Sequence, residues 1–187
     1  MKKIIHKITE KSLDALDMHM DKCINSEEYK TYFNGISSTE HYRLLSYLSI
    51  QFNSETIIDI GTLKGCSALA LSTNPTNEVI SFNLDNQLDL NNPPDNIEFI
   101  IGDCLHEQYK DIIMKSKIIL LDTYHDGTFE EIFYSYLKDN NYSGTLLLDD
   151  IKLNDEMIQF WNNIDLPKED ITNLGHWSGT GVVYFNE

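Results

Sequence analysis

The stretch IIDIGTLKGCSALALS, from Ile57 to Ser72, decides the fold of this chain. Its first residues form a continuous apolar run, which is typical of a buried parallel strand. Its last residues are small and apolar and favour a helix. Gly61 and Gly65 lie in the turn between them, where glycine allows a sharp turn and close approach of a ligand to the backbone. The stretch therefore predicts a strand, a ligand-binding turn and a helix.

The spacing of this turn restricts its ligand. It lacks the G-x-G-x-x-G pattern of dinucleotide sites, and Lys64 precedes Gly65 instead of following it as in a phosphate loop. Asp59, two residues before Gly61, would repel a phosphate and attract an ammonium group. We therefore expect a ligand that carries both charges, with its amine near Asp59 and its carboxylate at the backbone amides and the Ser67 hydroxyl. A dinucleotide oxidoreductase is disfavoured for the same reasons.

Short apolar runs continue after this stretch and alternate with amphipathic segments or loops. This alternation predicts an α/β protein with a doubly wound, Rossmann-like and mostly parallel sheet. The tail contains two further runs without a helix between them, which predicts an antiparallel hairpin and brings the sheet to seven strands. The predicted strands are TIIDI, EVISF, IEFII, KIILL and GTLLL, followed by DITNLG and GTGVVYFNE in the hairpin.

The region before the first strand is expected to be helical. We predict a single domain over 1–187, with a helical cap at 1–50 and an α/β core at 55–187. A helix-like apolar stripe in SLDALDMHMDKCI predicts one helix there, and a second helix is expected to begin near Ser38, capped by Ser38 or Thr39. The stripe consists of Leu13, Leu16, Met20 and Ile24.

The connection after the second predicted strand is unusual. NLDNQLDLNNPPDN, between Phe82 and Ile97, is rich in Asn and Asp and contains a Pro pair, all poor helix formers. A crossover between parallel strands normally contains a helix. The sequence instead predicts a loop or a single turn here.

The composition of the chain limits the kinds of partner that it is expected to bind. The net charge of -16 disfavours nucleic acid, which requires a basic face, and is suited to attracting a divalent cation. No apolar run reaches the roughly 18 residues of a membrane span, and we identify no signal peptide. Cys23, Cys66 and Cys104 are unevenly spaced, which indicates neither a disulfide framework nor a thiolate zinc site. We expect a cytoplasmic protein without membrane or nucleic-acid partners; self-association stays open.

DIGTLKGCSALAL resembles motif I of class I S-adenosylmethionine-dependent methyltransferases. It is most similar to the branch that contains catechol-type small-molecule O-methyltransferases and cephalosporin-hydroxylase-like enzymes. That motif consists of an acidic residue, any residue, Gly, three residues, Gly, any residue and Ser, which this chain fills with Asp59, Gly61, Gly65 and Ser67. The resemblance covers roughly residues 38–187 and implies that these residues, with Thr62, bind the cofactor. The alternative is a strand, turn and helix without a ligand.

The resemblance also implies where the ribose and adenine would bind. An acidic residue at the end of the second strand holds the ribose in this family, but Asn83 stands there, and Asp85 can substitute for it. Gly102, Asp103 and Cys104 resemble the family's G-D-x step beside the adenine amine, with Leu105 able to pack on the ring. The alternatives are a solvated loop at Asn83 and Asp85 and a helix cap at Asp103.

Three acids follow the fourth and fifth predicted strands: Asp122, Asp149 and Asp150. The carboxyl ends of adjacent parallel strands face one crevice, so repulsion among these carboxylates must be offset by a cation, a proton or wide spacing. Oxygen ligands suit Mg²⁺. The resemblance implies that these three hold Mg²⁺ and that His125, near the place of the branch's catalytic lysine, acts in catalysis. The alternatives are a strand-end cap at Asp122 and a turn at Asp149 and Asp150.

Other polar and aromatic residues carry weaker signals. His41 and Tyr42 on the second predicted helix, and His176 and Trp177 in the hairpin, are placed to border an acceptor site. We interpret His41 and Tyr42 as a partly exposed face and Trp161 as core packing.

Two functions compete at this stage. The first is an enzyme that moves a methyl group from S-adenosylmethionine to a hydroxyl of a small molecule, with Mg²⁺ on the three acids activating the hydroxyl and His125 taking its proton. The second is a non-catalytic S-adenosylmethionine-binding or methyltransferase-like partner protein with a reshaped pocket. Asn83 and the short connection over 83–96 favour the second, whereas the complete motif I and the crevice acids favour the first.

Overall fold

The structure is a computed structural model, and it describes residues 1–186. These residues form one seven-stranded sheet with the strand order β3-β2-β1-β4-β5-β7-β6. The strands are β1 (Thr56–Ile60), β2 (Glu78–Asn83), β3 (Ile97–Ile101), β4 (Ile118–Leu121), β5 (Gly144–Asp149), β6 (Lys168–Asp170) and β7 (Thr180–Phe185). The first five run parallel, and β7 is antiparallel to both β5 and β6. The predicted fold class is confirmed.

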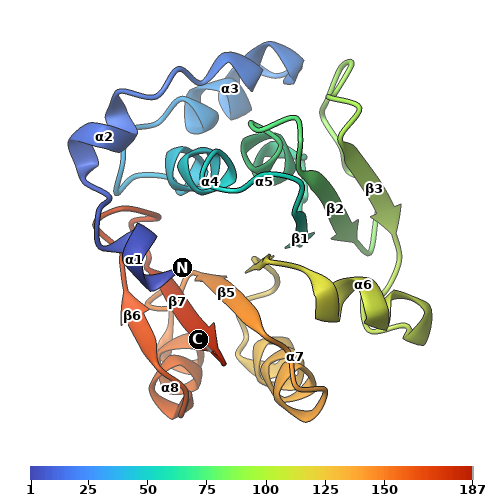
Figure 1. Cartoon of the computed structure of the whole chain (residues 1–187). Coiled ribbons are helices and arrows are strands. Elements are labelled where there is room, and N and C mark those ends of the chain that lie inside the picture. The colour runs from blue at the N-terminus through green and yellow to red at the C-terminus, as the bar shows by residue number, and fades with distance from the viewer. Residues whose placement is uncertain (187) are drawn as a thin grey trace.

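Helices cover both faces of this sheet (Figure 1). One face carries α4 (Tyr42–Ser49) and α5 (Cys66–Leu71), and the other carries α6 (Lys110–Lys115), α7 (Thr128–Asp139) and α8 (Asp155–Asn163). A short 3-10 helix, η2 (Glu107–Tyr109), leads into α6. The carboxyl ends of the parallel strands lie between these two helical layers and are free to form a site.

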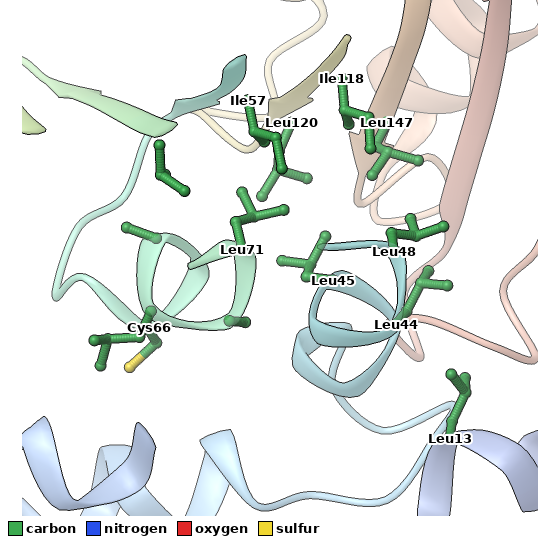
Figure 2. Close-up of a cluster of buried hydrophobic side chains, with 14 of the residues drawn as sticks. Leu13, Leu44, Leu45, Leu48, Ile57, Cys66, Leu71, Ile118, Leu120 and Leu147 are labelled. Carbon is green, nitrogen blue, oxygen red and sulfur yellow. The ribbon is translucent and has the colours of Figure 1, made fainter. Parts of the chain in front are cut away.

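The continuous apolar runs of the sequence are explained by this double cover. In β4, Ile118 and Leu120 belong to the hydrophobic cluster under α4 and α5, whereas Ile119 and Leu121 belong to the cluster under the other layer. Figure 2 shows the first cluster, in which leucines of α4 and α5 gather beneath the strands and Leu13 lies on the outer side of α4. Successive side chains of a strand point to opposite faces, so both must be apolar.

The N-terminal region differs from the prediction. Instead of one helix over SLDALDMHMDKCI, the chain forms four short elements: α1 (Lys2–Ile5), α2 (Glu10–Asp14), η1 (His19–Cys23) and α3 (Glu27–Phe33). Leu13 and Ile24 are buried from separate elements, so the apolar stripe reflects tertiary packing instead of one continuous helix. The predicted start of the next helix is also wrong, because Ser38 is left-handed (φ 61°) and α4 begins at Tyr42.

Arg43 of α4 connects the N-terminal region to the rest of the fold by hydrogen bonds. Its guanidinium donates to the carbonyls of Gly35 at 2.6 Å, Asn34 at 3.0 Å and Leu16 at 2.9 Å. Short helices leave several carbonyls without helical partners. One side chain on α4 therefore satisfies carbonyls from two connections of the N-terminal region.

The connection between β2 and β3 contains no helix within the described residues 84–96, as predicted. It pairs instead with the N-terminal region. Leu90 forms an isolated antiparallel bridge with Ile24, and the Asn91 amide donates to the Cys23 carbonyl at 2.7 Å. The amide of Asn25 donates in turn to the Asp89 carbonyl at 3.0 Å. Main-chain pairing with a distant segment thus takes the place of a covering helix.

The final hairpin is antiparallel as predicted, but its first strand is shifted. β6 occupies Lys168–Asp170, and most of the predicted strand DITNLG is a turn in which the Leu174 amide donates to the Ile171 carbonyl at 2.8 Å. Asp170 starts this turn by accepting from the Thr172 amide at 3.1 Å. Among the described residues, no helix combines the length and apolar character that a membrane crossing requires.

Candidate active site

The glycine turn has the backbone that its sequence predicts. Gly61 and Gly65 are left-handed, with φ of 97° and 94°. A Cβ on Gly61 would lie 1.5 Å from the Asp122 carbonyl oxygen, so β1 and the end of β4 meet there without room for a side chain. The Gly65 amide donates to the Thr62 carbonyl at 2.7 Å and closes the turn before α5. Gly61 is therefore required by contact with backbone, whereas Gly65 faces the Leu90 side chain.

Asp59 has a different setting from the one predicted. It is fully buried, and one of its oxygens accepts from the Ser81 hydroxyl at 2.8 Å and the Ser67 hydroxyl at 3.1 Å. Burial raises the pKa of Asp59 to about 6, although the two serines act to lower it. Asp59 does not line the neighbouring cavity, and the amine expected near it stays a prediction. Its carboxylate ties β1 to β2 and α5.

A cavity of about 610 Å³ lies at the carboxyl ends of β1 to β4. Among the predicted cofactor and catalytic residues, those that line it are Gly61, Asn83, Asp85, Asp103, Cys104, Asp122 and His125. Thr62, Gly65 and Ser67 do not line this cavity. They belong instead to the turn next to Asp59. Apart from Leu105, the sequence did not indicate the apolar part of the lining, which includes Leu63, Phe82, Phe129 and Ile132.

The polar residues on the β2 and β3 side of the cavity are held by their own loops. The Asn83 side-chain amide donates to the Asp85 carbonyl at 2.6 Å. The Asp103 carboxylate accepts from the Leu105 amide at 2.8 Å within a turn, whereas the predicted helix cap at Asp103 is wrong because the next helix, η2, is capped by His106. Leu105 also lines the cavity. Asp103 can therefore hold its own turn and face the cavity at the same time.

The three predicted metal ligands meet three histidines. His125 Nε2 lies 3.2 Å from Asp122 and 3.3 Å from Asp150. His176 Nδ1 lies 3.2 Å from Asp149 and 3.0 Å from Asp150. His41 Nδ1 lies 3.2 Å from Asp149, and the Ser178 hydroxyl donates to Asp150. The repulsion expected among the carboxylates is thus offset by imidazole groups, a solution that the sequence analysis did not consider.

Burial and charge act in opposite directions in this cluster. Burial lowers the pKa of His176, but Asp149 and Asp150 outweigh it and raise that pKa to about 10. Burial likewise lowers the pKa of His41, and Asp149 raises it to about 9. Burial raises the pKa of Asp149, yet His41 and His176 bring it below its ordinary value. Asp122 keeps a raised pKa because burial and the Asp149 charge both favour its protonated form.

His41 and His176 are functional candidates that the sequence analysis ranked too low. His41 is 3% exposed, contrary to the predicted partly exposed face. A signal for His176 was present, since the antiparallel pairing of β5 with β7 sets Asp149 opposite Thr180 and so brings the preceding turn toward the acids. Nothing comparable in the sequence marks His41, which reaches the acids only through the packing of α4 on the sheet.

Comparisons with known proteins show which solved structures share this fold. No protein-family model matches the chain, and no curated protein matches its sequence. Solved structures do match in three dimensions. The SAH-bound methyltransferase PaMTH1 of Podospora anserina aligns with a TM-score of 0.58 and 14% identity, covering 78% of each chain. The O-methyltransferase of Bacillus cereus in complex with SAH aligns with a TM-score of 0.53 and 16% identity, over 76% of this chain and 80% of the other.

A third structure, a putative caffeoyl-CoA O-methyltransferase of Staphylococcus aureus, aligns with a TM-score of 0.55 and 15% identity, over 78% of this chain and 82% of the other. At these identities the likeness concerns the fold. This chain therefore has the α/β fold of S-adenosylmethionine-dependent methyltransferases.

Proposed function

We propose that this protein is a methyltransferase that moves a methyl group from S-adenosylmethionine to a hydroxyl of a small molecule. The observation that carries the proposal is the cavity at the carboxyl ends of β1 to β4, which has Asp122 and His125 in its lining. Its volume of about 610 Å³ suits a nucleoside-sized ligand, since small-molecule sites typically measure about 300–1,000 Å³. The named activities of the matching structures support the same reaction class.

The cavity lining suits the parts of this cofactor. Phe82, Leu105 and Phe129 offer apolar surface for a flat heterocycle, and Asp103 lies beside them for an exocyclic amine. Asn83 has committed its amide nitrogen to the Asp85 carbonyl, which leaves its oxygen free to accept from a ribose hydroxyl. The bound cofactor supplies an electrophilic sulfonium methyl. The protein holds the acceptor in line with that methyl, and such alignment is a major source of rate enhancement.

His125 is the proposed proton acceptor. It lines the cavity, and its Nε2 lies 3.2 Å from Asp122. Burial lowers the pKa of His125, but Asp122 and Asp150 outweigh it and raise that pKa above its ordinary value. Asp122 holds the ring through Nε2, so Nδ1, which has no hydrogen-bond partner among the described residues, is the atom of the neutral imidazole that would take the proton.

The magnesium assistance that the sequence predicts stays a prediction. The expected ligands Asp122, Asp149 and Asp150 each have an imidazole nitrogen within 3.3 Å. Mg²⁺ takes oxygen ligands and keeps several waters, so this mixed set of nitrogen and oxygen donors does not fit it well. No step of the proposed reaction therefore depends on Mg²⁺.

A non-catalytic S-adenosylmethionine-binding protein is the second candidate. Asn83 stands where an acidic residue is expected, and the connection over residues 84–96 has no covering helix. These two departures affect the ribose side of the cavity alone, and the residues proposed for proton transfer are unaffected.

Calorimetry with S-adenosylhomocysteine tests both candidates together. We expect binding at micromolar concentration, and its absence would overturn both. Incubation with S-adenosylmethionine and a panel of phenols, sugars and hydroxy acids then separates them, with release of S-adenosylhomocysteine as the readout. His125→Gln is expected to lose turnover and keep cofactor affinity. Binding without turnover on any acceptor would favour the second candidate.

A further inference from the structure

Three side chains converge behind the cavity, from α4, the end of β5 and the turn before β7. We propose that His41, Asp149 and His176 form a binding site for one divalent transition-metal ion. Each offers a ligand atom, and these atoms all lie within 4.8 Å of one another. This set shares only Asp149 with the three acids that the sequence indicated. The proposal does not depend on methyl transfer, because it rests on these side chains alone.

The distances match those of a shared ion. His41 Nδ1 lies 3.2 Å from one Asp149 oxygen, and His176 Nδ1 lies 3.2 Å from Asp149 as well. With metal–ligand bonds of about 2.1 Å, two ligand atoms at a tetrahedral angle lie about 3.4 Å apart. The two separations from Asp149 thus match a shared ion, and the separation between the two imidazole nitrogens, at most 4.8 Å, would have to shorten toward this value when the ion binds.

His41 supplies an independent observation. It is 3% exposed, and neither ring nitrogen has a hydrogen-bond partner of acceptable geometry among the described residues. Its approach to Asp149 is close in distance but does not meet the angle of a hydrogen bond. A buried polar group without a partner is costly, and such groups in native proteins mark a functional role or an unseen partner. A metal ion would give this imidazole its partner.

His176 has the outer partner that metal-bound histidines commonly have. Its Nδ1 faces Asp149, and its Nε2 lies 3.7 Å from the half-buried Glu40 carboxylate. This distance is too long for a direct hydrogen bond, so Glu40 would act on a ligating imidazole through its charge, which raises the basicity of the ring. The competing explanation is an ion-pair network without metal, since His176 Nδ1 also lies 3.0 Å from Asp150 and 3.0 Å from the Ser178 hydroxyl.

The donor set selects the kind of ion. Two imidazoles and one carboxylate suit Zn²⁺, Mn²⁺ or Fe²⁺, whereas Mg²⁺ prefers oxygen. Three protein ligands leave at least one position for water or substrate. Asp149 also belongs to a second convergent set with Asp122 and His125, so the ion would lie next to the proposed proton acceptor.

The experiment measures metal content directly. The chelator-treated protein is titrated with Zn²⁺, Mn²⁺ and Mg²⁺ by calorimetry, and bound metal is counted by mass spectrometry after dialysis. We expect one Zn²⁺ per chain, bound at least about a hundredfold more tightly than Mg²⁺, together with a higher melting temperature. His41→Gln and His176→Gln are expected to lose this ion, whereas the exposed His19→Gln is expected to keep it.

Three results would overturn the proposal: no stoichiometric metal in the folded chain, unchanged binding in both histidine variants, or loss of the ion in His125→Gln with retention in His41→Gln. Circular dichroism checks the fold of each variant. If a histidine variant does not fold, Glu40→Gln decides instead, because it keeps all three ligands. We expect it to weaken Zn²⁺ affinity by about tenfold, and unchanged affinity would count against the proposal. Cofactor calorimetry is independent of these readouts, so the proposed function can fail separately.

Discussion

The Ser67 hydroxyl donates a 3.1 Å hydrogen bond to the Asp59 carboxylate, so the first helical turn of α5 is fastened to β1 inside the core. Ser81 of β2 donates to the same oxygen, while the other oxygen of Asp59 has no hydrogen-bond partner among the described residues. A motif that resembles a cofactor contact in sequence thus also acts as an internal joint between two strands and a helix.

This joint predicts a pH-dependent stability. Burial raises the pKa of Asp59 from 3.8 to about 6, so the folded chain binds the proton more tightly than the unfolded chain. The stabilisation is complete below about pH 4 and is lost as the pH rises to about 6, by up to about 3 kcal/mol. Asp59→Asn is expected to remove this decline in urea unfolding measured across that range. The exposed Asp111→Asn serves as control, and an equal decline in Asp59→Asn would refute the assignment.

The two glycines of the turn are expected to differ in their tolerance of alanine. Both are left-handed, which costs a non-glycine residue about 1–3 kcal/mol. Gly65→Ala meets the side chains of Leu90 and Leu88, whereas Gly61→Ala meets the Asp122 backbone carbonyl at 1.5 Å. We expect Gly61→Ala to lose at least about 2 kcal/mol more than Gly65→Ala in denaturant unfolding. Similar losses would mean that the end of β4 can move away.

Arg43 is predicted to hold the N-terminal elements in place. Arg43→Lys keeps the charge but cannot reach the Gly35, Asn34 and Leu16 carbonyls at once, because an ammonium lacks the planar fork. We expect a loss of about 2–3 kcal/mol and faster amide exchange before residue 38. Lys115→Arg, in an exposed ion pair, is the control and should change stability by less than about 0.5 kcal/mol. Unchanged exchange in Arg43→Lys would show that packing alone holds this region.

Asn83 is predicted to matter more for cofactor binding than Asp85. Its oxygen is the free acceptor at the end of β2, whereas Asp85 contributes its carbonyl to hold Asn83 and has an exposed side chain. Asn83→Ala should weaken S-adenosylhomocysteine binding by about tenfold in calorimetry. Asp85→Ala should weaken it by less than about threefold. The reverse order of effects would assign the ribose to Asp85.

The sequence predicted the sheet well because the determinants of the sheet are local. Apolar runs such as Ile118 to Leu121 pack against two helical layers at once, as a strand covered on both faces requires. The N-terminal helix prediction was wrong because Leu13 and Ile24 follow a helical spacing but are buried from separate short elements. Spacing alone cannot distinguish one long helix from several pieces pressed onto the same surface.

The sequence predicted only those site residues whose place follows from the order of the strands. Asp122 and Asp149 follow strands, and their place in the sheet brings them together. His41 reaches the cluster from the helical layer that contains α4. Its contacts depend on how α4 packs on the sheet, which no local sequence pattern indicates. The hydrogen bonds of Asp59 inside the core could not be predicted, because its partner Ser81 comes from β2 and the register that pairs the two residues is known only from the sheet.

The pairing of Ile24 with Leu90 links the N-terminal region to one wall of the cavity. Leu90 rests on Gly65 in the binding turn, and its neighbours in the same loop include the cavity residues Asp85 and Gln87. A chain shortened to begin after residue 26 would keep every residue of the cavity and still lose the strand-like partner that fixes this wall. Substitutions near Ile24 are therefore expected to change the shape of the cavity without altering any residue that lines it.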